Sequence, residues 1–138
     1  MKIILISAGH ARNPCIKEAA AGYIKRIRRY CVVEETEVSG RAASAKMSVA
    51  EACKKDGALI VARMKKGFFT VAMDQGGKAY TTAELSRLVE KVMAGAHGPG
   101  KGLCFIVGGP FGLHESVRER CDEALSLSRL TLPHVLAR

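Results

Sequence analysis

The sequence predicts an α/β fold in which a mostly parallel, doubly wound sheet carries helices on both faces. Apolar, β-branched segments typical of strands alternate along the chain with segments that show the period or the start signals of helices. This alternation favours parallel strands joined by helical crossovers. The chain has 138 residues, of which 48% are apolar, so it can bury a core, and we expect residues 1–138 to form one domain.

The first strand and helix are the clearest elements. Residues 3–6 are apolar and β-branched, which is typical of a strand buried on both faces of a sheet. Asn13 and Pro14 then provide a helix cap and a proline at the first helical position, and the helix is expected to run to about Arg29. The apolar stripe predicted to face the core consists of Ile16, Ala20, Tyr23, Ile24 and Ile27.

The middle of the chain repeats the alternation. We expect a strand at residues 31–38, although glutamates interrupt it, then a polar loop at 39–46 and a helix at 48–64. Residues 68–73 are predicted to be the third strand, which ends at the polar and glycine-rich stretch 74–77.

Thr81 and Glu84 form a capping-box pattern that starts a third helix, and Gly95 is expected to end it. Its buried stripe is predicted to be Leu85, Leu88, Val89 and Val92. The rest of the fold is predicted as a strand at 103–107, a short helix at 115–121 and a strand at 125–127. Thr131 and Pro133 resemble a helix start barely one turn before Arg138, so we expect the natural protein to continue beyond this sequence.

The charge balance favours polyanionic partners. Lysine and arginine total 22 against 13 acidic residues, a net charge of +9. Such a surplus on a small domain indicates nucleic-acid binding, and the alternative is a solvated basic surface without a partner.

The five cysteines are odd in number and show no paired metal-ligand spacing. This usage predicts neither a disulfide framework nor a zinc site, and it favours a reducing, cytoplasmic compartment. We expect Cys104 to be a small buried hydrophobe. The sequence shows no signal-peptide pattern and no stretch that could span a membrane, so we expect neither metal nor membrane.

Two glycine-containing stretches follow predicted strands, at 73–77 and 108–112. Ligands of parallel sheets bind outside the carboxyl ends of strands, and glycine lets a backbone approach them closely. The alternative is a pair of tight turns without a ligand. Neither the dinucleotide fingerprint nor a phosphate-binding loop is present. A third stretch, 125–134, alternates serines and leucines and is a candidate for part of an adenosine pocket.

These stretches carry a resemblance to a known family. Gly108-Gly109-Pro110-x-Gly112-Leu113, followed by Leu125-Ser126-x-Ser128-x-x-Thr131-x-Pro133-His134, resembles the SPOUT-class methyltransferases. Within that class the chain resembles the ribosomal RNA large subunit methyltransferase H family. Gly9 and Tyr23-x-Lys25-Arg26 agree with this resemblance, which spans residues 1–138.

The resemblance implies a C-terminal trefoil knot, an exception to the rule that chain connections are unknotted. It implies that S-adenosylmethionine is the methyl donor and that the acceptor is N3 of a pseudouridine in a stem-loop of 23S ribosomal RNA. It also implies a homodimer in which the partner completes each site. Family members continue past the Pro-His motif with a long helix and a Tyr-His tail.

The same resemblance implies a set of donor-binding residues. By motif position these are Met73, Gly108, Leu127, Ser128, Arg129, Leu130, Thr131 and Leu132. Met73 stands where leucine is usual, a change that keeps volume and apolarity. We expect Gly108→Val to block donor binding and to leave the fold intact.

Methyl transfer needs the acceptor nitrogen in line with the methyl group and the loss of its proton. No catalytic residue is assigned. Among the histidines, we expect His97 on the surface and His114 as a helix cap, while His10 and His134 are weaker candidates for the base. The candidates for RNA contact are Lys25, Arg26, Arg29 and Arg129, with Arg28, Lys65 and Lys66 as further cations. The alternative function is an RNA-binding module of the same fold without activity.

Overall fold

A computed structural model describes residues 1–10, 12–38, 47–96 and 100–137 of the chain. The predicted loop at 39–46 and His97 lie outside the described residues. The elements are β1 (Lys2–Ala8), α1 (Pro14–Ile27), β2 (Val32–Val38), α2 (Val49–Arg63), β3 (Phe68–Ala79), α3 (Thr82–Met93), β4 (Gly102–Val107), α4 (Glu115–Arg118), β5 (Glu123–Ser126) and α5 (His134–Ala137).

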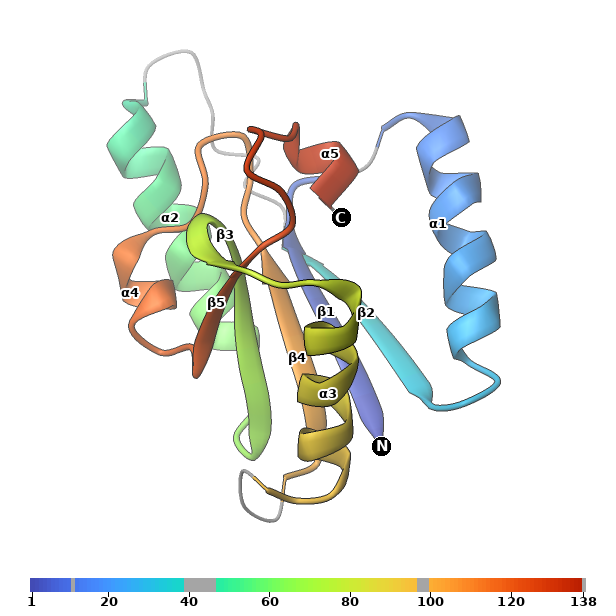
Figure 1. Cartoon of the computed structure of the whole chain (residues 1–138). Coiled ribbons are helices and arrows are strands. Elements are labelled where there is room, and N and C mark those ends of the chain that lie inside the picture. The colour runs from blue at the N-terminus through green and yellow to red at the C-terminus, as the bar shows by residue number, and fades with distance from the viewer. Residues whose placement is uncertain (11, 39–46, 97–99, 138) are drawn as a thin grey trace.

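The five strands form one parallel sheet in the order β2-β1-β4-β3-β5. This confirms the predicted α/β fold with helices between the strands. Helices α2 and α4 cover one face, α3 covers the other, and α1 lies beside the β2 edge (Figure 1). The C-terminal knot implied by the resemblance stays a prediction.

Each face of the sheet has its own core. Ile60 of α2 and Val117 of α4 pack against Ile4, Ile6 and Ile106 of the sheet. On the opposite face, the core combines two residues of α3 with three from the strands: Val71, Leu88, Val92, Leu103 and Leu125. Burying these side chains supplies the main drive to fold.

The helix starts predicted from capping residues are confirmed. The Asn13 side chain accepts a hydrogen bond from the Cys15 N–H at 2.9 Å, and Ser48 with Glu51 forms a complete capping box. The predicted capping box that starts α3 is present, and Gly95 follows α3 with a positive φ of 75°. Cys104 is buried as predicted, and burial raises the pKa of its thiol to about 12, which keeps it a neutral hydrophobe.

Three predictions need correction. The third strand continues to Ala79 instead of ending at Met73, because it pairs twice with β5. Helix α4 stops at Arg118, because the chain turns back and pairs Asp122 with the backbone of Thr70. The fifth strand is accordingly Glu123–Ser126, not 125–127.

The predicted inner stripe of α1 is covered only in part. Ile16, Ala20 and Ile24 are half-buried, but Tyr23 and Ile27 have exposed fractions of 65% and 40%. Periodicity identifies an apolar face but not what covers it, and α1 packs mainly on the edge strand β2.

Candidate functional site

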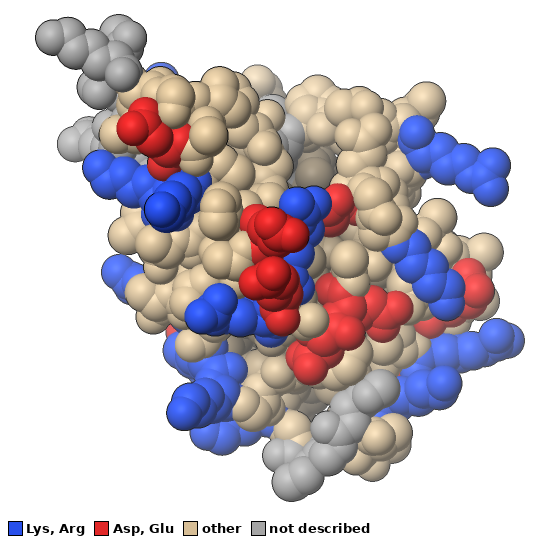
Figure 2. Space-filling view, turned by 90° about the vertical axis from the view of Figure 1, so that its left-hand side faces the viewer, with Lys and Arg blue, Asp and Glu red and all other residues tan. Residues whose placement is uncertain are grey.

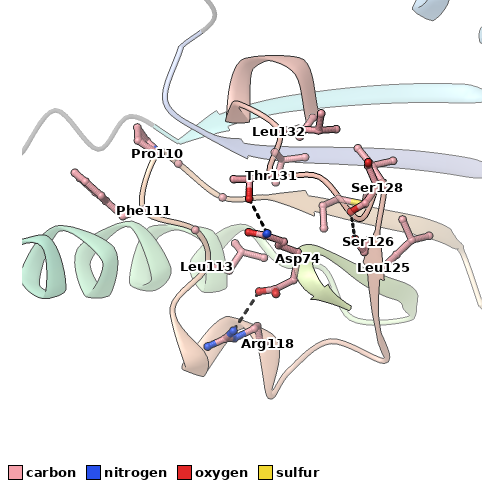
Figure 3. A pocket seen from close by; sticks show the side chains of 18 of the residues that line it. Asp74, Pro110, Phe111, Leu113, Arg118, Leu125, Ser126, Ser128, Thr131 and Leu132 are labelled. Carbon is pink, nitrogen blue, oxygen red and sulfur yellow. Dashed lines mark hydrogen bonds and ion pairs between the residues drawn. The ribbon is translucent and has the colours of Figure 1, made fainter. Parts of the chain in front are cut away.

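A cavity of about 490 Å³ lies at the carboxyl ends of β3, β4 and β5 (Figure 3). Its walls come from the three stretches that the sequence singled out, around residues 73–75, 108–112 and 125–132. Parallel pairing brings the ends of these strands to one edge of the sheet. The volume lies within the range of roughly 300–1,000 Å³ that is usual for small-molecule sites.

A break in the β3–β5 pairing shapes one wall. Leu125 is the partner of both Met73 and Lys78, so residues 74–77 leave the ladder as a bulge. Gly77 allows the bulge to close tightly, because a methyl group there would lie 2.6 Å from the Ala124 carbonyl carbon. The bulge directs Asp74 and Gln75 toward the cavity.

Asp74 ties the bulge to α4. Its Oδ1 accepts a hydrogen bond from the Gly76 N–H at 2.8 Å, and its Oδ2 accepts one from Arg118 Nη1 at 3.2 Å. The Asp74 side chain is 15% exposed and that of Arg118 is 47% exposed. These are the two charged side chains among the described residues that line the cavity.

The loop after β4 forms a second wall. The Gly112 N–H donates to the Gly109 carbonyl oxygen at 3.0 Å, and Gly112 has a φ of 80°, a conformation that favours glycine. A methyl group at Gly108 would lie 2.6 Å from the carbonyl carbon and oxygen of Gly112. The expectation that Gly108→Val leaves the fold intact is therefore wrong, since the side chain must displace the loop.

Helix α2 lies close to this loop at Asp56. A methyl group at Gly109 would meet the carboxyl Oδ2 of Asp56 at 3.4 Å, so this carboxyl lies close to the loop backbone. Burial raises the pKa of Asp56.

The segment after β5 is held by side-chain hydrogen bonds. Ser126 Oγ donates to the Ser128 carbonyl oxygen at 2.8 Å, and Ser128 Oγ accepts from the Leu130 N–H at 3.0 Å. Gln75 Nε2 donates to Thr131 Oγ1 at 2.7 Å and thereby joins the bulge to this segment (Figure 3). The serines and threonine fix the backbone, so the intervening leucines are free to form apolar walls.

Large apolar side chains around the cavity remain exposed. Leu130 is 73% exposed, and Phe111 and Leu127 are about half exposed. A concave site with largely apolar walls and a few polar side chains is typical of a small-molecule pocket.

The structure brings seven of the eight predicted donor-binding residues to this cavity. They are Met73, Gly108, Leu127, Ser128, Leu130, Thr131 and Leu132. Arg129 does not line it within the described part of the chain and is exposed.

The sequence reasoning missed Arg118 and Phe111 as cavity residues. Phe111 occupies the variable position of the quoted Gly108–Gly112 motif, and that placement was the available signal. Arg118 had no local signal, because its place depends on how α4 packs beside the β3 bulge.

The histidines occupy different positions. His114 caps α4 as predicted, with its Nδ1 accepting from the Ser116 N–H at 3.2 Å. His10 follows β1, is exposed, and its Nδ1 hydrogen-bonds to Glu37 of β2. His134 begins α5, and its side chain lies outside the described part.

Comparison with known proteins identifies the family. Residues 1–138 match the family described as "Predicted SPOUT methyltransferase". The chain belongs to the SPOUT methyltransferase family. It is 36% identical over 135 residues to the ribosomal RNA large subunit methyltransferase H of Solidesulfovibrio magneticus, covering 97% of this chain and 83% of the relative. The protein of the same name from Desulfovibrio desulfuricans is 37% identical over 133 residues, covering 96% of this chain and 82% of the relative. That from Ruminiclostridium cellulolyticum is 34% identical over 141 residues, covering 100% and 87%.

Across residues 1–10, 12–38, 47–96 and 100–137, no helix combines the length and apolar character needed to cross a membrane. Over the same ranges, no group of three or more histidine, cysteine or acidic side chains is arranged to hold a metal ion.

From the geometry of the loop after β4, we expect alanine at Gly108 and alanine at Gly109 to affect the Tm differently. Gly108→Ala should lower the Tm of the protein, because the new methyl group would overlap the Gly112 backbone. Gly109→Ala should leave the Tm within about 2 °C, because its nearest neighbour would be the movable Asp56 carboxyl at 3.4 Å. Thermal unfolding followed by circular dichroism measures both, and equal effects would contradict the loop geometry.

Proposed function

We propose that this SPOUT-family protein transfers the methyl group of S-adenosylmethionine to N3 of a pseudouridine in a stem-loop of 23S ribosomal RNA. The observation that carries the proposal is the convergence of the three motif stretches on one cavity. The names of the relatives support ribosomal RNA as the class of substrate. We further propose that residues 1–138 form a single domain, since one sheet contains every strand found among the described residues.

The cavity suits an adenosyl sulfonium in size and chemistry. Its leucines and Phe111 offer apolar surface to a purine ring, and the fixed backbone of 126–131 offers hydrogen-bonding groups. When bound, the donor supplies a methyl group that its positive sulfur has already activated. We propose Met73, Gly108 and residues 127–132 as the donor-binding set, with Arg129 at its outer side.

The protein's task in such a transfer is mostly positioning. The acceptor nitrogen must lie in line with the methyl group, at roughly 3 Å, and rigid walls hold that geometry better than mobile ones. The hydrogen bonds of Ser126, Ser128 and Gln75 provide that rigidity here. We assign no residue to the removal of the N3 proton.

Three of the basic candidates for RNA contact, Lys25, Arg26 and Arg29, lie at the C-terminal end of α1 and in the turn after it. Between Pro14 and Tyr30 the sequence has five basic residues and one acidic residue. The Arg26 guanidinium lies 5.7 Å from the centre of the Tyr23 ring, and Tyr23, Arg26, Ile27, Arg29 and Tyr30 line a shallow groove of about 270 Å³. Exposed tyrosine and arginine side chains stack readily on the bases of single-stranded RNA.

The face of α2 and α4 has a different charge. Figure 2 shows acidic side chains gathered in the middle of that face, with basic side chains around them. Three acidic residues are exposed around α4: Glu115 in the helix, Glu119 at its C-cap, and Asp122 after it. Glu34 is hydrogen-bonded to Lys2 and to Lys65, and these two cations lower the pKa of its carboxyl to about 2, so Lys65 is already paired. We therefore propose that RNA approaches α1 through Lys25, Arg26 and Arg29, with Arg129 near the cavity.

We also propose that the protein acts in the cytoplasm on the large ribosomal subunit or the assembled ribosome, as a homodimer. The free cysteines of the described residues support a reducing compartment. The exposed leucines around the cavity support a partner subunit that completes each site.

The direct test combines binding and transfer. Calorimetric titration with S-adenosylhomocysteine should give saturable binding, and labelled methyl from S-adenosylmethionine should appear at one pseudouridine of 23S rRNA in isolated ribosomes. Binding of rRNA without binding of S-adenosylhomocysteine would instead favour an RNA-binding module of the same fold.

The charge of α1 makes a second prediction. Replacing Lys25, Arg26 and Arg29 together by glutamine should weaken RNA retention at moderate salt and make the slope of log affinity against log salt shallower by about 2 to 3. The matched control replaces Lys54, Lys55 and Arg63, three exposed cations of α2, by glutamine. Filter binding over a salt series measures both, and an equal change in the control would show that only net charge matters.

A further inference from the structure

We propose that Asp74 and Arg118 form a subsite for the amino-acid end of the methyl donor, with Arg118 binding the α-carboxylate and Asp74 the α-ammonium group. This inference rests on the proposed function, since it assigns a polarity to the ligand of that same cavity. The ligand chemistry is that of any α-amino-acid zwitterion joined to an apolar aromatic group.

The Arg118 guanidinium has N–H donors beyond the one that it gives to Asp74. A guanidinium carries five N–H donors in a planar fork, and Asp74 Oδ2 accepts one from Nη1 at 3.2 Å. The side chain lines the cavity and is 47% exposed, so part of the fork faces the space that a ligand would occupy. A carboxylate matches the geometry of that fork better than a neutral group does.

Asp74 is held in place and still has accepting capacity. The Gly76 N–H and Arg118 each occupy one of its oxygens. An ionised carboxylate offers about four lone-pair sites, so an ammonium group can be added without breaking either bond. The side chain is only 15% exposed, so solvent screens its charge less than it would screen a surface carboxylate.

The charge balance favours a zwitterion over a lone anion. Asp74 and Arg118 together carry no net charge, and a zwitterion adds one charge of each sign beside its opposite. An RNA phosphate would place its negative charge beside Arg118 but also beside Asp74, whose carboxylate repels it. The pair therefore distinguishes an amino acid from a phosphate.

The position of the pair in the cavity fits the two ends of the donor. Figure 3 shows Asp74 and Arg118 on the side of the site away from Leu132, and their ion pair is drawn there. The leucines of residues 127–132 supply apolar surface on the other side. An adenosyl group against the leucines leaves its amino-acid end free to reach the ion pair.

The test compares two ligands that differ only at this end. S-adenosylhomocysteine carries the amino-acid group, and 5′-methylthioadenosine keeps the adenosine and the sulfur but lacks it. In the unaltered protein, calorimetry should give at least tenfold tighter binding of S-adenosylhomocysteine. Arg118→Gln and Asp74→Asn should each reduce the affinity for S-adenosylhomocysteine by about ten- to hundredfold and leave the affinity for methylthioadenosine unchanged.

The control variant is Arg120→Gln. Arg120 follows α4, donates from Nη1 to the Ser116 carbonyl oxygen at 2.9 Å, and does not line the cavity, so neither affinity should change. Equal affinities of the two ligands for the unaltered protein would overturn the subsite even if a variant failed to fold. If Arg118→Gln lost affinity for both S-adenosylhomocysteine and methylthioadenosine, Arg118 would have a structural role and the subsite would be contradicted. If the variant lost only its affinity for RNA, Arg118 would be a phosphate contact, which would also contradict the subsite. Failure of the unaltered protein to bind either ligand would instead contradict the proposed function.

Discussion

The double pairing of Leu125 is the constraint on which the candidate site depends. Because Leu125 opposes both Met73 and Lys78, residues 74–77 must leave the sheet, and they leave it toward the cavity. From there Gln75 reaches Thr131 and Asp74 reaches Arg118, so one irregularity joins three walls of the site. A regular ladder would direct Asp74 and Gln75 to opposite faces of the sheet, so the cavity could not receive both side chains.

The helices differ in how much they contribute to the core beneath this site. The sheet and α2, α3 and α4 form two dense cores, whereas α1 has no fully buried residue. Together with the turn that follows it, α1 carries exposed tyrosine and arginine side chains. A helix that contributes little burial contributes little stability. Its composition is better explained by contact with another molecule, and its charge favours RNA.

Much of the fold could be predicted because its signals are local. Caps such as Asn13 and Thr81 depend on residues within one turn, and buried strands such as Gly102–Val107 stand out by composition. The extension of β3 could not be predicted, because it depends on a partner strand about fifty residues away. The same limit applies to Arg118, which reaches Asp74 across 44 positions of sequence, and to the cost of a side chain at Gly108, which arises from the backbone of a folded loop. Motif resemblance found seven cavity residues because motifs record long-range contacts that local patterns do not.

We propose that three separate stretches of the chain form one donor site. Amide hydrogen exchange with and without S-adenosylhomocysteine tests it most directly, because exchange slows where a ligand contacts or rigidifies the backbone. We expect slower exchange in residues 74–77, 108–113 and 126–132 together, with α1 unchanged. Protection of only one of these stretches, or protection confined to α1, would contradict the account.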